Sequence, residues 1–174
     1  MEIVKTYRQS IPATRFIGKK YGDEDRVNGG FGQQWGEWFQ NGWFDVLEEA
    51  AGGAEALRAL YEDGGATVGL MRWKEAEPFQ YWIGMFLPAG TPAPDGYGFV
   101  DFPAADLGIC WFHGREDEIY GKEHLCAAPL QEMGMEIVAD EQGAWWFFER
   151  YACPRFTTPD ENGAVILDIG HYVK

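Results

Sequence analysis

Residues 144–153 read Ala-Trp-Trp-Phe-Phe-Glu-Arg-Tyr-Ala-Cys and contain four consecutive aromatic side chains. Bulky aromatic residues without glycine or proline favour an extended, half-buried chain, so the stretch is predicted to be a β-strand. Side chains alternate between the two faces of a strand. Because both faces here are apolar enough to need covering, we expect this strand to lie in the interior of its sheet.

The alternation sets Glu149 between Phe147 and Tyr151, on the face that begins with Trp145, while Arg150 points to the opposite face. A carboxylate among aromatic rings costs free energy unless it is paired, hydrogen-bonded or protonated. Glu149 therefore either bonds a buried polar group or reaches solvent at the strand end, or it faces a ligand in an aromatic pocket. The stretch alone slightly favours the first interpretation.

Length and composition indicate a folded chain with a substantial core. The 174 residues suit one domain or two small fused halves. An apolar fraction of 46% and an aromatic fraction of 16% exclude a disordered chain. Eight tryptophans are many for this length, and aromatic side chains beyond the needs of packing are typical of ligand cavities and interfaces.

The chain is strongly acidic, with 28 Asp and Glu against 14 Lys and Arg and a formal net charge of -14. Such a field repels nucleic-acid phosphates and anionic lipids, and it attracts cations. With no basic stripe and no helix-turn-helix pattern, we expect no direct binding of nucleic acid. No apolar run approaches the ~20 residues of a membrane span, and the N-terminus lacks the apolar core of a signal peptide. A soluble, cytoplasmic protein without membrane contact is expected.

The sequence predicts neither a metal site nor a cofactor. Cysteines and histidines are widely spaced and match no metal-ligand pattern, so the thiols are expected to be free. These residues are Cys110, Cys126, Cys153, His113, His124 and His171. Residues 28–32 lack the lysine and the preceding strand of a phosphate-binding loop. Ser10 is the only serine and has no G-x-S-x-G around it, which argues against a serine hydrolase.

Residues 33–51 have helical periodicity, with one aromatic arc predicted to face the core. The arc consists of Trp35, Trp38, Phe39, Trp43 and Val46. Asn41-Gly42 lies inside this pattern, and because glycine costs about 1 kcal/mol there relative to alanine, we expect a bend or break.

The remaining segments complete a repeated order of elements. Extended chain is predicted at 2–20 with an interruption at Pro12, a helical turn at 54–61, strands at 67–73, 79–87, 105–113 and 164–173, and a helix at 120–135 that either kinks or begins at Pro129. A connection rich in proline and glycine at 88–96 separates halves of roughly 1–88 and 97–174.

Each half therefore contains a β-α-β-β unit. A short internal echo supports the duplication, because Ile11-Pro12-Ala13 and Phe102-Pro103-Ala104 occupy the same place in the two units. Two such units usually give an antiparallel sheet with helices on one face and a cleft where the halves meet. The fold class predicted is α+β.

The doubled unit, the two Pro-Ala elements, Phe112-His113-Gly114 before the second helix and Phe148-Glu149-Arg150-Tyr151 resemble the GyrI-like small-molecule-binding superfamily. It includes effector-binding domains of AraC-type and MerR-type regulators, the gyrase-inhibitory protein and stand-alone drug-binding proteins. The resemblance covers nearly the whole chain and implies a pocket between the halves, with aromatic walls and a central glutamate. Glu149 is the matching position.

In several members of that superfamily the glutamate pairs with lipophilic cations, and the resemblance therefore favours the second interpretation of Glu149. It implies a stand-alone effector-binding or multidrug-binding domain that senses or sequesters small aromatic cations. The chain lacks the DNA-binding domain of the regulators, so a separate DNA-binding regulator is an expected partner. The candidate pocket walls are Trp35, Trp38, Tyr81, Trp82, Trp111, Trp145, Phe147 and Tyr151.

Two alternatives use the same fold. Some members of the superfamily hydrolyse cyclopropane-bearing DNA-alkylating compounds, and Glu149 would then be the general base, with Tyr151 or Tyr81 orienting the substrate. An acidic protein-interaction module of the gyrase-inhibitor type is the third hypothesis, for which residues 116–118 (Glu-Asp-Glu) are the local indication.

Overall fold

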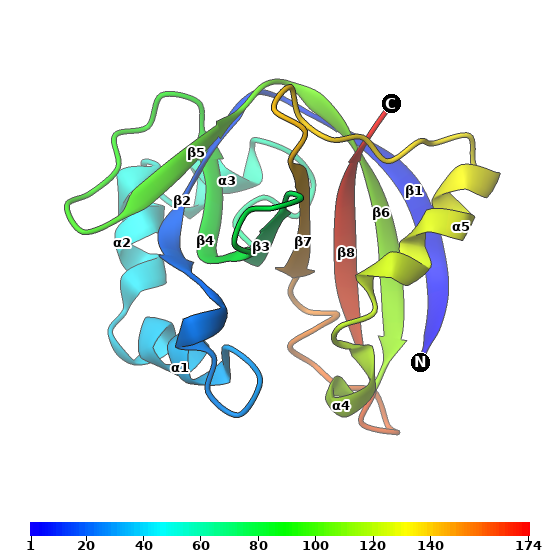
Figure 1. The fold of residues 1–174 in the computed structure, drawn as a ribbon. Coiled ribbons are helices and arrows are strands. Elements are labelled where there is room, and N and C mark those ends of the chain that lie inside the picture. Colours follow the sequence, from blue (N-terminus) through cyan, green and yellow to red (C-terminus); the bar gives the residue numbers. More distant parts are fainter.

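The computed structural model describes all residues from 1 to 174. Eight strands form a single antiparallel sheet in the order β1-β6-β8-β7-β3-β4-β2-β5 (Figure 1). The strands are β1 (Glu2–Ile11), β2 (Thr14–Tyr21), β3 (Thr67–Trp73), β4 (Gln80–Pro88), β5 (Gly98–Phe102), β6 (Ala105–Gly114), β7 (Trp145–Tyr151) and β8 (Val165–Val173). The helices are α1 (Gly32–Gln40), α2 (Trp43–Ala50), α3 (Ala54–Arg58), α4 (Glu116–Ile119) and α5 (Ala127–Glu132), with 3-10 turns η1 (Asp23–Asp25) and η2 (Glu123–Cys126). The predicted α+β class is confirmed.

The aromatic strand β7 lies in the interior of the sheet, between β8 and β3, as predicted. Its neighbours come from different halves of the chain, so β7 and β3 join the two halves of the sheet. We call the line along which β7 and β3 pair the seam between the halves. Glu149 lies on it, because its backbone pairs with Gly69 on β3 and with Ile169 on β8.

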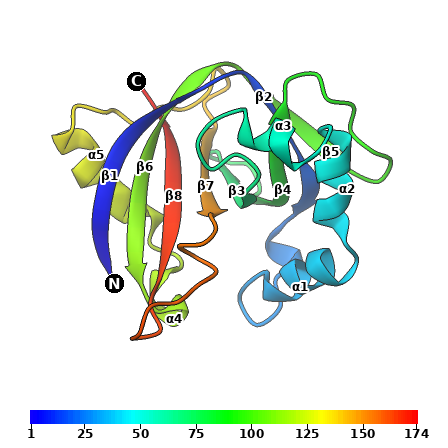
Figure 2. The ribbon, with the colours of Figure 1, turned by 180° about the vertical axis from the view of Figure 1, so that it is seen from behind.

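The two halves exchange their first strands. β1 pairs with β6 of the second half, whereas β5 pairs with β2 of the first half. The two Pro-Ala connections, residues 12–13 and 103–104, lie next to each other at the top of the molecule (Figures 1 and 2). Beside them Ile11 pairs with Ala105, and Thr14 pairs with Phe102. Each unit thus begins with an additional strand before the predicted β-α-β-β order.

All helices lie on one face of the sheet, as strand alternation demonstrates. Phe16 and Ile109 belong to a buried cluster that contains no helical residue, whereas the next residues along the same strands, Ile17 and Cys110, pack against helices. The first-half helices supply Trp38, Leu47 and Leu57 to one helix-side cluster, and the second-half helices supply Ile119, Cys126 and Leu130 to the other. No helix has the length and apolar character needed to cross a lipid bilayer.

The predicted break in the helix at 33–51 is present, because Gly42 adopts a left-handed conformation (φ 66°) between α1 and α2. The break changes which residues face the core. Trp38 is fully buried, but Phe39 is 64% exposed and Val46 also faces outward, so the predicted aromatic arc is wrong at these two positions. Leu47 takes the buried position in α2 because the rotation of the second helix is reset after Gly42.

The predicted helix at 120–135 consists of shorter pieces, η2 and α5, preceded by α4. Pro129 neither kinks nor begins a helix; it is the third residue of α5. This position accommodates proline because the first backbone N–H groups of a helix have no intrahelical acceptor.

A buried ion network lies beneath the seam, on the side of β7 away from Glu149. The guanidinium of Arg150, 1% exposed, donates through Nε to Asp168 Oδ2 (2.9 Å). Arg155, from the β7–β8 connection, donates to both Asp168 (2.9 Å) and Asp63 (2.8 Å). Burial alone would raise the pKa of Asp63, but the hydrogen bonds from Arg155 and the charge of Arg150 hold it below its usual value. The network ties the loop before β3 to the second half of the chain.

Candidate functional site

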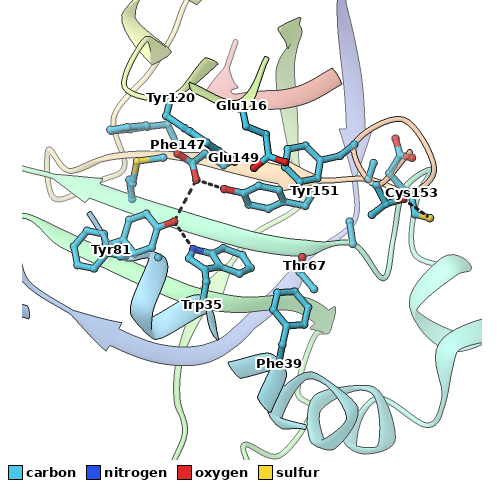
Figure 3. Close-up of a pocket in the computed structure, with 18 of the residues that line it drawn as sticks. Trp35, Phe39, Thr67, Tyr81, Glu116, Tyr120, Phe147, Glu149, Tyr151 and Cys153 are labelled. Carbon is cyan, nitrogen blue, oxygen red and sulfur yellow. Dashed lines mark hydrogen bonds between the residues drawn. The ribbon is translucent and has the colours of Figure 1, made fainter. Parts of the chain in front are cut away.

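A cavity of about 1450 Å³ opens on the helix side of the seam between the two halves. Strands β3, β4 and β7 form its inner wall, α1 borders one side and the segment from α4 to η2 borders the other (Figure 3). The volume of the cavity is larger than the roughly 300–1,000 Å³ of most small-molecule sites. Half of the residues that line it are hydrophobic.

Glu149 points into this cavity from β7 and is 7% exposed. The hydroxyl of Tyr151 donates to its Oε2 at 2.7 Å, and the hydroxyl of Tyr81 donates to the same oxygen at 3.2 Å (Figure 3). No protein group donates to Oε1. The carboxylate is thus held in place through one oxygen and has the other free for a ligand.

Burial determines the protonation of this carboxyl. Desolvation raises the pKa of Glu149 to about 7, although the hydrogen bonds from Tyr151 and Tyr81 act in the opposite direction. Burial, followed by the negative charge of Glu149, raises the pKa of both tyrosines, so they remain protonated donors. A cation bound beside Glu149 would favour the ionised carboxylate.

Aromatic contacts position the two tyrosines. The Trp35 indole donates to the Tyr81 hydroxyl at 2.9 Å, and the Phe31 ring stacks on Tyr81 with centroids 4.2 Å apart and an interplanar angle of 3°. The Trp35 ring meets Tyr151 edge-on at 4.8 Å. Helix α1 and the residue before it, Phe31, therefore contribute both a cavity wall and the groups that orient the hydrogen-bond donors of Glu149.

Gly69 provides the space for this arrangement. It is the cross-strand partner of Glu149 on β3, and a Cβ there would overlap the Tyr81 hydroxyl and lie 3.1 Å from Glu149 Oε2. Its φ is not in the left-handed region, so the need for glycine here comes from side-chain space and not from the backbone. Sequence reasoning did not select Gly69, since an isolated glycine in a strand has no local signal for what lies opposite.

The structure brings together the residues Trp35, Tyr81, Phe147, Glu149 and Tyr151 of the predicted set in one cavity. Tyr81 and Trp82 were both predicted as pocket walls, but they are successive residues of β4 and point to opposite faces, so only one of them can face the cavity. Tyr81 does, while Trp82 packs edge-on against Phe16 (6.3 Å) in the cluster on the other face of the sheet.

Three further tryptophans expected on the cavity wall also lie elsewhere. Trp38 is fully buried beneath α1, with its indole donating to Tyr21 at 3.1 Å. Trp111 is on the opposite face of the sheet from the helices, edge-on to Tyr7. Trp145 shares the face of Glu149 but lies at the outer end of β7, 38% exposed and beyond the cavity.

Several cavity residues lie outside the predicted set of wall residues, although most of them come from elements that were predicted. They are Phe31, Met71, Phe79, Tyr120, Glu123 and Phe156. Glu116 belongs to the acidic run noted in the sequence, and it faces the cavity. Five carboxylate residues but only two arginines border the space, so its field favours a cation.

Solved structures share this fold over nearly the whole chain. A Staphylococcus aureus MU50 protein, described as a bacterial transcription regulation protein, matches with a TM-score of 0.58 at 16% identity, covering 98% of each chain. SAV2435 bound to tetraphenylphosphonium matches with a TM-score of 0.53 at 16% identity, covering 98% of this chain and 94% of SAV2435. A hydrolase from Listeria innocua matches with a TM-score of 0.53 at 10% identity, covering 100% of this chain and 94% of the hydrolase.

At these identities the similarity shows the fold alone. The sequence matches no protein-family model and no curated protein. The chain thus has an α+β fold that is also found in a ligand-binding protein and in a protein related to transcription regulation.

Proposed function

We propose that this protein binds small, lipophilic aromatic cations in the cavity, with Glu149 as the counter-charge, and that it acts as a sensor or sequestering protein. The observation that carries the proposal is the buried carboxylate with one oxygen free of protein donors, surrounded by aromatic rings. Ring faces attract a cation by ~0.5–2 kcal/mol each, and a desolvated carboxylate adds a charge partner. The tetraphenylphosphonium bound by SAV2435 is a ligand of this class.

The test is a titration with tetraphenylphosphonium, followed by tryptophan fluorescence, on the wild type and on Glu149→Gln at pH 8. Glutamine retains the size of the side chain and can still accept the two tyrosine hydrogen bonds. Loss of the buried charge is expected to weaken binding by about 30-fold or more, or roughly 2 kcal/mol. Trp35 is the tryptophan that lines the cavity and is expected to dominate the signal change.

Glu132→Gln is the matched control, because Glu132 is exposed on α5 and lies outside the cavity. It removes the same charge from the molecule and is expected to leave the affinity unchanged. Equal affinities of the wild type and Glu149→Gln would show that Glu149 is not the counter-charge.

Hydrolysis is a second candidate, favoured by the near-neutral pKa of Glu149 and by the fold shared with the Listeria innocua hydrolase. Glu149 Oε1 would take a proton from water while the water oxygen forms a C–O bond to a cyclopropane carbon. The strained C–C bond breaks, its electron pair moves to a carbonyl oxygen conjugated with the ring, and that oxygen then takes the proton from Glu149. Tyr151 would orient the substrate. General-base catalysis contributes ~10²–10⁴-fold.

Incubation with a cyclopropane-bearing alkylating compound, followed by mass spectrometry, tests this reaction. The expected product carries one added water and forms at least ~100-fold more slowly with Glu149→Gln. Recovery of the unaltered compound after prolonged incubation with the wild type would exclude the reaction for that substrate.

A further inference from the structure

The cavity contains two carboxylates in addition to Glu149 on its second-half wall. Glu116 of α4 and Glu123 of η2 both line the same space. Their neighbours in the segment are neutralised, since Glu118 lies 3.8 Å from the N-terminal ammonium group and Asp117 lies 3.5 Å from Arg115. Lys122 is turned away and donates to the Glu118 carbonyl at 2.6 Å. No basic group forms an ion pair with Glu116 or Glu123.

The position of Glu123 is fixed by its backbone. Its carbonyl oxygen accepts a hydrogen bond from His171 Nε2 at 3.3 Å, and the His171 ring stacks on Phe147 at 5.6 Å. Burial lowers the pKa of His171 to about 4, so the imidazole is neutral at pH 7 and does not offset the charge of Glu123. No positively charged group of the protein therefore compensates the negative charge of Glu116 and Glu123.

These charges act on the same space as the free oxygen of Glu149. The charge of Glu123 contributes to the raised pKa of Glu149, and the charges of Glu116 and Glu149 both contribute, after burial, to the raised pKa of Tyr120. Figure 3 shows Glu116 and Tyr120 on the same side of the cavity as Glu149, with Trp35 and Phe39 across from them. The cavity thus has an acidic wall facing an aromatic wall.

The basic residues at the rim do not balance this wall. The cavity is lined by two arginines, Arg26 and Arg58. Arg26 forms an ion pair with Asp23 at 2.8 Å and lies over the Phe31 ring. Only Arg58 therefore has no carboxylate partner. A volume of about 1450 Å³ also leaves room beyond a ligand that occupies the surroundings of Glu149 alone.

We propose that the cavity is built for elongated aromatic dications, with one cationic centre at Glu149 and the second at Glu116 and Glu123. The proposal rests on cation binding at Glu149 and adds the ligand class that this site prefers. The aromatic body of such a ligand would lie against α1 while its two charged ends face the acidic wall. A monocation would leave Glu116 and Glu123 without a partner.

The experiment compares two probes of equal size and shape by calorimetry at pH 8. The first is a bis-benzamidine whose rings are joined by an alkyl chain, and the second is the same molecule with one amidinium replaced by a neutral carboxamide. The dication is expected to bind the wild type at least ~10-fold more tightly. In Glu116→Gln/Glu123→Gln this preference is expected to disappear, because the affinity for the dication falls much more than the affinity for the monocation. A tenfold change corresponds to about 1.4 kcal/mol.

Asp117→Asn/Glu132→Gln is the control, since it removes two negative charges that lie outside the cavity. It should keep the preference for the dication. Equal binding of the two probes by the wild type, or an equal loss for both probes in the Glu116/Glu123 variant, would overturn the proposal while leaving cation binding at Glu149 intact. Failure of both probes to bind the wild type would instead overturn cation binding in this cavity altogether.

Discussion

The affinity for tetraphenylphosphonium is expected to fall by up to about 100-fold between pH 8 and pH 5. The pKa of Glu149 is raised to about 7 by desolvation, so the free carboxyl is about 90% ionised at pH 8 and about 1% ionised at pH 5. The ligand carries a permanent charge and does not titrate. Because it binds the ionised carboxylate, protonation competes with it, and the affinity falls as the pH drops through the pKa.

Glu149→Gln separates this effect from other titrations. The variant retains all three histidines and every other carboxyl, so any pH dependence from those groups persists in it. A much flatter profile than that of the wild type is expected. The assignment fails if both proteins show the same slope, or if the wild-type affinity is constant from pH 8 to pH 5.

Local sequence patterns were sufficient for most of the strands and for the two faces of β7. The period of two placed Phe147, Glu149 and Tyr151 on one face because it depends only on the strand itself. The exchange of β1 and β5 had no such signal. It depends on pairing between residues about 100 positions apart, such as Tyr7 with Ile109, which local propensity does not encode.

The cavity residues that lie on one strand could be predicted from the alternation of that strand. Those that depend on where distant segments meet could not. Tyr81 and Trp82 alternate in any strand, but the choice of the inward residue depends on which face of β4 the helices cover. Glu123 and Tyr120 line the cavity from a segment that contains only short helical pieces. Such a segment has no regular periodicity from which the direction of their side chains could be predicted. Gly69 matters only because Glu149 and Tyr81 converge above it.

Replacing Asp168 by asparagine is expected to lower the free energy of unfolding by about 3–5 kcal/mol. Asp168 is 0% exposed and accepts hydrogen bonds from both Arg150 and Arg155. Removing one member of a buried ion network leaves charges without compensation, and this costs more than the intact network contributes. The amide group of asparagine would also direct N–H groups toward guanidinium donors. For a chain of this length the loss corresponds to roughly 10 °C in Tm.

Urea unfolding followed by circular dichroism measures this change, with Asp106→Asn as the control. Asp106 also bonds an arginine on a neighbouring strand, Arg8 at 2.9 Å, but this pair is exposed to solvent, which screens it. Little change is expected for the control, and an equal loss in the two variants would show that burial is not the cause.

Asp168→Asn is also expected to weaken the binding of tetraphenylphosphonium, because the ion network contacts the cavity at two points. Asp63, which accepts hydrogen bonds from Arg155, lines the cavity, and Arg150 directly follows Glu149 in β7. A variant that stays folded but binds tetraphenylphosphonium as tightly as the wild type would show that the network supports the fold and not the cavity.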